Sequence, residues 1–456
     1  MLKCDVAVIG GGMAGAMAAL GAGRGGKKVI LFTKGAGATT LSSGAIDVCG
    51  SPISAPGVPL SRFLSVRENL FETIARMPHH PYSVLALNNP DDPAGGMMAM
   101  IEETMGFLRE KLRVAGMGLL GDASRQKPAP TMLGTWKLTS FVQATQQLGA
   151  PEGKTAVAGI IGLSAPDAGS LASSLQATLA ATGLGGGDRI EHFEVELGGR
   201  KTWTMEEACL ELARPGGLKA FLGLLEEAAG NRYRTILIPP VLPPVSTDVI
   251  AVDLKAAHSA VADQMKELRL PGGTIIKEML ATPPSTPGRR LKDALDTALE
   301  SAGVEVFRAS ASGFERNRKA LASCSVEVNG ATRHIQADAW VLASGKFIAG
   351  GLKKDRAFSE ANLNLPLFCD GRQVDEIFTQ RLLRRNVLAD HPVFGVGLMT
   401  DRRLRPIDQD GKVILENLFA AGSVLGGYNY HTGGCGLGLC CLTGYRAGRE
   451  ACVEIL

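Results

Sequence analysis

The sequence predicts an α/β protein with a Rossmann-like fold that is interrupted by an inserted substrate or cap domain. The chain opens with a strand, a glycine turn, a helix and a second strand, and a similar alternation of helices and strands returns near residue 285. The stretch between them is richer in proline and has a different pattern. We therefore expect a discontinuous first domain of residues 1–50 and 285–456, with residues 51–284 as the insertion. A chain of 456 residues exceeds what one hydrophobic core usually supports, which favours two domains.

The first β-α-β unit is predicted from short apolar runs. Residues 3–9 (KCDVAVI) predict a buried parallel strand, residues 13–23 an Ala-rich helix, and residues 28–32 a second strand. Further elements follow from the same kind of pattern. They are helices at 218–229, 291–302 and from about Gly436, strands at 235–238, 304–307, 339–343 and 417–421, and a hairpin around Asn329-Gly330.

The turn between the first strand and the first helix, GGGMAG at residues 10–15, fits the pattern G-x-G-x-x-G. In such a turn the first glycine permits the tight bend, the second lets the backbone approach a pyrophosphate, and the third lets the helix pack closely on the strand. The helix N-terminus then faces the negative charge of the phosphate. We expect cofactor contacts here from Gly10, Gly12, Met13, Ala14 and Gly15.

An acidic residue normally ends the second strand of such a unit and binds ribose hydroxyls. Between Val6 and Ile46 this sequence has no Asp or Glu, and Thr33 and Lys34 stand at the expected position. A threonine hydroxyl still bonds a ribose or a phosphate, but a lost charged hydrogen bond weakens the grip by about 1.5–3 kcal/mol. A lysine there also suits a 2′-phosphate, which leaves NADP as a minor alternative.

Two later segments repeat the strand-then-glycine pattern. The strand at 339–343 is followed by Ser344-Gly345, and the strand at 417–421 is followed by Gly422-Ser423. A nicotinamide dehydrogenase does not need these late segments, whereas a flavoprotein returns its chain to the first unit in this way. The helix that begins with Gly436 and Leu437 would point its N-terminus at the N1/O2 edge of a flavin, where reduction places negative charge. The sequence therefore predicts a flavoprotein.

Composition and charge narrow the function further. The net charge of +3 and the lack of a basic tract interleaved with aromatics argue against nucleic acid. None of the nine cysteines forms a C-x-x-C pair, so we expect no iron–sulfur cluster or other metal site within this chain. The absence of a signal peptide and of an apolar run of about 18 residues predicts a cytoplasmic chain that contacts a membrane only through a partner.

Several segments resemble the flavoprotein superfamily of fumarate reductases, succinate dehydrogenases and aspartate oxidases, and more closely the family of B subunits of anaerobic glycerol-3-phosphate dehydrogenases. The matching segments cover both ends of the chain, while residues 51–280 match loosely. They are CDVAVIGGGMAG, TTLSSGAID, PPSTPGRRL, VLASGKFIAGGL, FGVGLMTDRRLRP and ENLFAAGSVLGGYNYHTGGCGLGLCCLTGYRAG. The second of these adds Ser42, Ser43 and Gly44 to the expected cofactor contacts.

The resemblance implies a Rossmann-like FAD/NAD(P)-binding flavoprotein fold and a subunit that oxidises glycerol 3-phosphate to dihydroxyacetone phosphate. It also implies a second flavoprotein subunit, an iron–sulfur subunit that passes electrons to quinone, and peripheral association with the inner membrane through a partner. The family is described with FMN, in agreement with the missing carboxylate near Thr33, because FMN has no adenosine ribose. The glycine turn argues instead for a pyrophosphate, so FMN is our first expectation and FAD its alternative.

Oxidation of an alcohol by a flavin needs a base for the hydroxyl proton and a cation for the substrate phosphate. His391 and His431 are candidate bases, and Arg402 is a candidate anion clamp, with Arg289 and Arg290 as further candidates. Each has an ordinary interpretation as a surface or hydrogen-bonded structural residue. Two other functions stay open, a stand-alone flavin-dependent oxidoreductase of the fumarate reductase or aspartate oxidase type, and an electron-relay flavoprotein subunit without catalysis.

Overall fold

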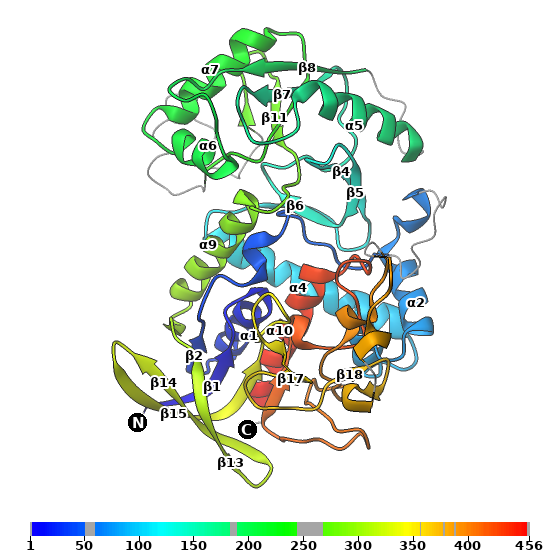
Figure 1. Cartoon of the computed structure of the whole chain (residues 1–456), viewed down its shortest axis with the longest axis vertical. Helices are drawn as coiled ribbons and strands as arrows, with labels where there is room; N and C mark the ends of the chain where they lie inside the picture. The colour runs from blue at the N-terminus through cyan, green and yellow to red at the C-terminus, as the bar shows by residue number, and fades with distance from the viewer. Residues whose placement is uncertain are drawn as a thin grey trace.

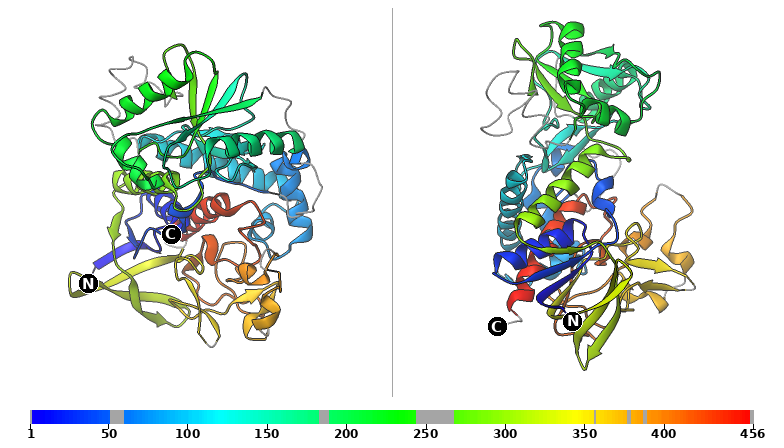
Figure 2. Two further views of the ribbon diagram at one scale, coloured as in Figure 1. Left: turned by 45° about the horizontal axis from the view of Figure 1, so that its top comes forward. Right: turned by 90° about the vertical axis from the view of Figure 1, so that its left-hand side faces the viewer.

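The computed structural model of the chain describes residues 2–50, 60–182, 189–243, 268–355, 357–376, 379–386 and 389–453. Within these ranges the strands form two main sheets. Figures 1 and 2 show that the second sheet with its helices lies at one end of the molecule and the first sheet at the other.

The first sheet has seven strands and is built from both ends of the chain. Its order is β12-β2-β1-β15-β14-β13, and β20 pairs with the second half of β15. Neighbours from β12 to β15, and β20, run parallel, whereas β13 and β14 are antiparallel. The strands are β1 (Leu2–Ile9), β2 (Val29–Phe32), β12 (Glu305–Phe307), β13 (Ala311–Asn317), β14 (Ala320–Val328), β15 (Ala331–Leu342) and β20 (Leu418–Ala420).

Helices pack on the first sheet, and their apolar side chains share its hydrophobic core. α1 (Met13–Arg24) and α10 (Gly436–Val453) pack closely because glycines of α10 face the backbone of α1. A Cβ atom on Gly444 would lie 2.2 Å from the carbonyl oxygen of Ala14, and one on Gly448 would lie 2.1 Å from that of Ala18. The other helices of this region are α2 (Val66–Arg76), α3 (Pro81–Ala86), α4 (Pro93–Val114) and α9 (Thr286–Ser301).

The second sheet has five strands in the order β10-β11-β9-β7-β8, of which β8, β7, β9 and β11 are parallel. Both of its faces are covered, since alternate residues of β7 join different cores. Ala156 and Ala158 pack with residues of α6 and α7, and Val157 packs with residues of α5. The elements are β7 (Thr155–Ile160), α5 (Ala168–Thr182), β8 (Ile190–Val195), α6 (Met205–Leu212), α7 (Gly217–Ala229), β9 (Thr235–Ile238), β10 (Leu268–Arg269) and β11 (Ile275–Glu278).

Short two-stranded pieces complete the architecture. The hairpin of β4 and β5 lies between the two regions (Figure 1). The strands of these short pieces are β3 (Leu119–Gly121), β4 (Lys127–Pro130), β5 (Trp136–Thr139), β6 (Phe141–Gln143), β16 (Leu352–Lys354), β17 (Phe358–Glu360), β18 (Phe368–Cys369) and β19 (Arg372–Gln373).

Core residues bear on where the insertion begins. Residues of α2, α3 and α4, among them Val66, Tyr82 and Ile101, belong to the same hydrophobic core as the first sheet. The two cores of the second sheet contain residues from Met132 to Met279. The division at 51–284 stays a prediction, and we propose that the inserted unit begins after α4.

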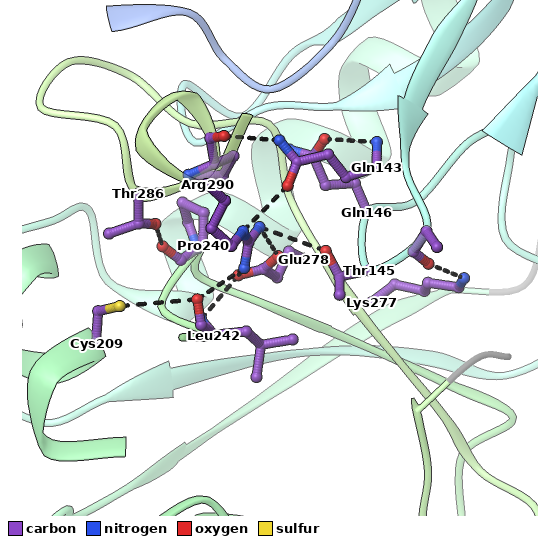
Figure 3. A network of polar contacts seen from close by, with 12 residues as sticks. Gln143, Thr145, Gln146, Cys209, Pro240, Leu242, Lys277, Glu278, Thr286 and Arg290 are labelled. Atoms are coloured by element: carbon purple, nitrogen blue, oxygen red, sulfur yellow. Dashed lines mark hydrogen bonds and ion pairs between the residues drawn. The ribbon is translucent and has the colours of Figure 1, made fainter. Parts of the chain in front are cut away.

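A buried polar network joins the two regions (Figure 3). Arg290 of α9 donates to Glu278 of β11 at 2.5 Å, and the side chains of this ion pair are 5% and 0% exposed. Arg290 also donates to Gln143 at 3.0 Å and to the Leu242 carbonyl oxygen at 2.7 Å. We call this network the joint between the two regions. The guanidinium of Arg290, a candidate anion clamp, is held in the joint by these contacts.

The predicted elements are close to those observed. The hairpin turn at Asn329-Gly330 is confirmed, with φ of 53° and 76°, which is the conformation that two-residue hairpin turns require. The strand predicted at 339–343 is the end of the longer β15, because the second strand of that hairpin continues into the centre of the sheet.

Candidate functional site

The predicted glycine turns meet at one edge of the first sheet. In register, Phe32 of β2 pairs with Ile9 of β1, Ile9 with Leu342 of β15, and Leu342 with Ala420 of β20. Each of these strands ends within a residue of this row, so the segments that follow leave the sheet together. Parallel α/β sheets bind their ligands at this carboxyl edge. A cavity of about 780 Å³ lies there, within the size range of cofactor sites.

The first glycine turn forms one wall of the cavity. Gly10 has φ of 113°, and a Cβ atom there would lie 2.2 Å from the Ala343 carbonyl oxygen. A Cβ atom on Gly15 would lie 1.7 Å from the Gly10 carbonyl oxygen, so this glycine permits the contact of helix and turn. Gly12 differs, because the nearest atom to its Cβ position is Thr39 Oγ1 at 3.5 Å. Space remains beside Gly12 for a ligand to approach the backbone.

Two helix N-termini face the cavity. The N-cap of α1 is Gly12, which supplies no side-chain cap, and its first turn contains no acidic residue. The amide of Met13 donates to Thr39 Oγ1 at 3.0 Å. Gly436, Leu437 and Cys440 bring the first turn of α10 to the same cavity. Helix N-termini carry partial positive charge, so this cavity favours an anionic ligand.

The segment 344–351 runs along the cavity and relates its two ends. A Cβ atom on Gly350 would lie 3.3 Å from Lys34 Nζ, at the end where β2 finishes. A Cβ atom on Gly345 would lie 3.7 Å from Ser423 Oγ, beside the α10 end. Thr33 also lines the cavity, but its hydroxyl donates to the Gly35 carbonyl oxygen at 2.9 Å. We call these two parts the β2 end and the α10 end.

At the α10 end the lining becomes polar and aromatic. Asp47 and Lys137 line the cavity and form an ion pair of 2.6 Å, with Lys137 contributed by β5. The ring of His431 packs on Phe394 and Tyr430 at centroid distances of 4.6 and 4.2 Å. Partial burial lowers the pKa of His431 below its usual 6.5, so the imidazole is neutral at neutral pH and able to accept a proton.

Lys346 is the buried lysine of this end. Its side chain is 3% exposed, its Nζ donates to the Phe394 carbonyl oxygen at 2.6 Å, and it lies 5.4 Å from the ring centroid of Tyr428. Burial lowers the pKa of Lys346 from 10.5 to about 7. Lysines with such a pKa occur at functional sites more often than elsewhere.

Buried polar atoms without a partner gather at this cavity. Five such side-chain atoms occur in the described part of the chain, and three of them, in Asp47, Ser344 and Tyr428, belong to cavity-lining residues. Buried polar atoms normally have hydrogen-bond partners, so these three indicate a polar ligand. Together with the two helix N-termini and the space beside Gly12, they fit a flavin with phosphate groups.

Most of the predicted cofactor residues line this cavity. Those that do are Gly10, Gly12, Met13, Ala14, Thr33, Lys34, Ser42, Ser43, Ser344, Gly345, Ser423, Gly436 and Leu437. Gly15, Gly44 and Gly422 do not line it, and a Cβ atom on each would clash with a neighbouring segment. These three glycines allow close packing around the cavity.

The predicted catalytic residues are not brought together. His431 lines the cavity, while His391 and Arg402 do not. His391 Nδ1 accepts from the Arg384 amide at 3.0 Å, and its ring lies 6.1 Å from Phe394, which in turn contacts His431. Arg402 is exposed in a loop, and its backbone carbonyl oxygen accepts a hydrogen bond from the Asn88 side chain. Arg289 pairs with Glu206 at 2.7 Å on the surface.

Several polar residues of the cavity were not predicted from the sequence. Lys346 stands within VLASGKFIAGGL, where a charged residue directly after the glycine turn is a usable signal. Lys137 and Asp47 are separated by 90 positions, so no local sequence pattern predicts their pairing. Thr39 lies in the loop of small residues after β2 and gives no distinct signal.

Membrane-spanning helices and metal-binding clusters are both absent from the described ranges. No helix there combines the length and the apolar character that a membrane crossing requires. The same residues contain no cluster of three His, Cys, Asp or Glu side chains placed to hold a metal ion.

The fold and the cavity define a flavoprotein of the dinucleotide-binding type. The family model described as "FAD binding domain" matches residues 5–202 and 226–439, and the chain belongs to this family. This supports a flavin cofactor and does not support FMN as the first expectation. The family is consistent with the predicted Rossmann-like flavoprotein fold.

Named relatives match the chain over nearly its whole length. It is 27% identical to the B subunit of the probable anaerobic glycerol-3-phosphate dehydrogenase of Halobacterium salinarum, over 100% of this chain and 99% of that one. It is 28% identical to the B subunit of the anaerobic glycerol-3-phosphate dehydrogenase of Vibrio cholerae, over 98% and 96%. Among solved structures, 3-ketosteroid delta1-dehydrogenase from Sterolibacterium denitrificans has 12% identity and a TM-score of 0.43, over 99% of this chain and 100% of that one.

Proposed function

We propose that the chain is the flavin-binding subunit of a glycerol-3-phosphate dehydrogenase and oxidises glycerol 3-phosphate to dihydroxyacetone phosphate. The observation that carries this proposal is the convergence of three glycine turns, two helix N-termini and a polar end on one cavity. The full-length likeness to proteins named as the B subunit of an anaerobic glycerol-3-phosphate dehydrogenase supports the substrate. Electron transfer through an iron–sulfur partner to quinone, a second flavoprotein subunit and peripheral membrane association remain parts of the same proposal.

The cofactor that we propose is FAD. FMN would fill the α10 end and leave the β2 end, with Lys34 and the Gly12 turn, without a ligand. FAD would extend across both ends, and its pyrophosphate would suit the α1 N-terminus, which has no acidic residue in its first turn. Thr33 offers no carboxylate to the adenosine ribose, so we expect the adenosine half to be held by backbone and helix contacts.

The residues of the α10 end suit a polyol phosphate. Lys137 offers a cation for the phosphate, since an ammonium has three donors and the bond to Asp47 uses one of them. We assign the hydroxyl proton of the substrate to His431, which lines the cavity and is neutral at neutral pH. A flavin bound in this cavity would supply the acceptor for the hydride of the substrate carbon. Among the described residues that line the cavity there is no arginine, which disfavours a dicarboxylate substrate that needs two anion clamps.

The first test is chemical identification of the flavin and of the electron donor. Flavin released by heat is identified by chromatography, with FAD expected at one per chain. The protein is then mixed with glycerol 3-phosphate without oxygen, and loss of the flavin absorbance is followed, with glycerol as the comparison substrate. A flavin that glycerol 3-phosphate never reduces, in the presence of the partner subunits as well, contradicts the catalytic role and favours an electron-relay subunit.

The second test concerns the anion clamp. Lys137→Met should raise the concentration of glycerol 3-phosphate needed for half-maximal reduction at least tenfold, because a charged hydrogen bond contributes about 1.5–3 kcal/mol. Reduction by glycerol should change little. Lys127→Met is the matched control, since Lys127 is exposed on the partner strand β4 and lies outside the cavity lining. Equal losses with both substrates would contradict phosphate binding by Lys137.

A further inference from the structure

Lys346 has no part in the proposed oxidation of glycerol 3-phosphate, yet it is buried in the cavity wall. It directly follows the glycine turn after β15, in the segment that borders the α10 end. Burying an ammonium group is costly unless an anion or several acceptors receive it. The groups that surround its Nζ atom therefore decide its charge.

The surroundings of Lys346 offer it little negative charge. Its Nζ donates to the Phe394 carbonyl oxygen of η5 (Pro392–Gly395), and the ring of Tyr428 lies below it. The titratable groups that interact with it electrostatically in the described part of the chain are Cys369 of β18 and Cys440 of α10. Burial raises the pKa of these thiols to about 11 and about 12, and it raises the pKa of Tyr428 well above 10. At neutral pH these neighbours are uncharged.

The N-terminus of α10 adds positive potential to the same place. Cys440, in the first turns of α10, is close enough to Lys346 that each affects the charge of the other. A helix N-terminus disfavours a second positive charge nearby and favours a negative one. Negative charge that arrives in the cavity therefore favours the protonated form of this lysine.

We propose that Lys346 takes up a proton when the cofactor in this cavity is reduced, so that electron uptake and proton uptake are coupled through its side chain. The proposal rests on the proposed binding of FAD. Two electrons and one proton reach the cofactor together, and a second proton from solution binds the Nζ lone pair of Lys346. The net charge of the buried site then stays constant. The pKa near 7 places this proton uptake within the physiological range.

The test is the pH dependence of the two-electron reduction potential of the full chain loaded with FAD, measured with mediator dyes. Above about pH 7, the wild-type equilibrium constant should change tenfold more per pH unit than that of Lys346→Met, which is about 30 mV per pH unit for two electrons. Lys346→Arg keeps its charge at all pH values and should also lose the extra slope. At a pH above 7 the potential of the Arg variant should exceed that of wild type, and that of the Met variant should be lower.

Lys353→Met is the matched control, because this lysine is close in sequence to Lys346, is exposed on β16 and lies outside the cavity lining. Its slope should equal that of wild type. Equal slopes in wild type and both Lys346 variants would overturn the proposal. Weaker FAD binding by the Lys346 variants with an unchanged slope would also overturn it and would make Lys346 a residue that only binds the cofactor. A wild-type chain that binds no flavin would overturn the proposed function itself.

Discussion

Two β-α units of this chain begin alike and end in different chemistry. β1 leads into α1 through three glycines, and the N-cap of that helix is Gly12, which has no side chain. β7 leads into α5 through residues 161–167, and the carboxylate of Asp167 accepts from the Ser170 amide at 2.8 Å. Hydrogen bonds from the backbone and the side chain of Ser170 lower the pKa of Asp167. The second unit has its own anion at the helix N-terminus, and the first leaves that place to a ligand.

The comparison shows why a parallel α/β sheet is not by itself a cofactor site. Both sheets have parallel strands and helices on their faces, which are the conditions for binding at the carboxyl edge. Of these two units, β1–α1 has a helix N-terminus free of acidic side chains and beside open space, whereas that of β7–α5 carries Asp167. Four predictions test this contrast between the two regions and the joint that connects them.

The largest expected effect comes from breaking the joint. Glu278→Ala leaves Arg290 buried without its anion, and removal of one partner of a buried ion pair costs about 3–5 kcal/mol. We expect that loss in the free energy of unfolding measured with urea. Glu206→Ala is the control, because the Glu206–Arg289 pair joins α6 and α9 at the surface and should contribute less than about 1 kcal/mol. Similar effects of both variants would contradict a special role of the buried pair.

The next effect concerns the α1 N-terminus. Gly12→Asp gives the first unit the anion that the second unit already has, and we expect FAD affinity to fall at least 100-fold, about 2.7 kcal/mol. The protein should still fold, because the φ of Gly12 is −75° and its Cβ position is open. Absorbance of the bound flavin and circular dichroism measure the two properties. A soluble variant with normal flavin content would show that this turn does not hold the phosphate.

A smaller effect is expected on the pH dependence of stability, to which a buried histidine of the first region should contribute and an exposed histidine of the second should not. Burial lowers the pKa of His80, in the first region, from 6.5 to about 3. The unfolded chain therefore binds this proton below about pH 6.5 and the folded chain does not, so stability is lost as the pH falls from 6.5 toward 3. The slope is up to about tenfold in the folding constant per pH unit. His80→Asn should flatten this loss in urea titrations, and substitution of the exposed His192 of β8 should leave it unchanged.

The smallest effect is expected from the capped helix of the second region. Asp167→Asn removes the charge at the α5 N-terminus while keeping a side chain that accepts a hydrogen bond. We expect less than a twofold change in FAD affinity and a slight fall in melting temperature. A marked loss of FAD would mean that the second sheet takes part in cofactor binding, and the two sheets would then not differ in the way described.

The sequence predicts well those features that depend on neighbouring residues. The turn of residues 10–15 and the Asn329-Gly330 hairpin are predictable because each needs particular residues at fixed spacing. The pairing of Lys137 with Asp47 is not predictable in this way, since the folding of a long intervening segment brings them together. The burial of Lys346 likewise depends on η5 and α10, which lie far from it in sequence.

Basic residues in loops show the same limit. The run at 402–405 contains three arginines, and sequence alone does not tell which of them could face a ligand. In the structure Arg403 pairs with Glu450, Arg405 pairs with Asp401, and Arg402 is exposed outside the cavity. Their roles depend on the direction of the loop, which distant contacts decide. The start of the insertion that we propose, after α4, is likewise not evident from local sequence, because the pattern of residues 66–114 does not tell which core these helices join.

The first sheet joins β1 from one end of the chain to β20 from the other, and α10 packs on α1. During synthesis on the ribosome, the glycine turn of residues 10–15 therefore emerges early, whereas the part of the cavity lining that comes from residues 418–453 is made last. A nascent or truncated chain that stops before α10 has half a cradle and no closed cavity. We therefore expect stable flavin binding only after the C-terminal segments that line the cavity have been synthesised.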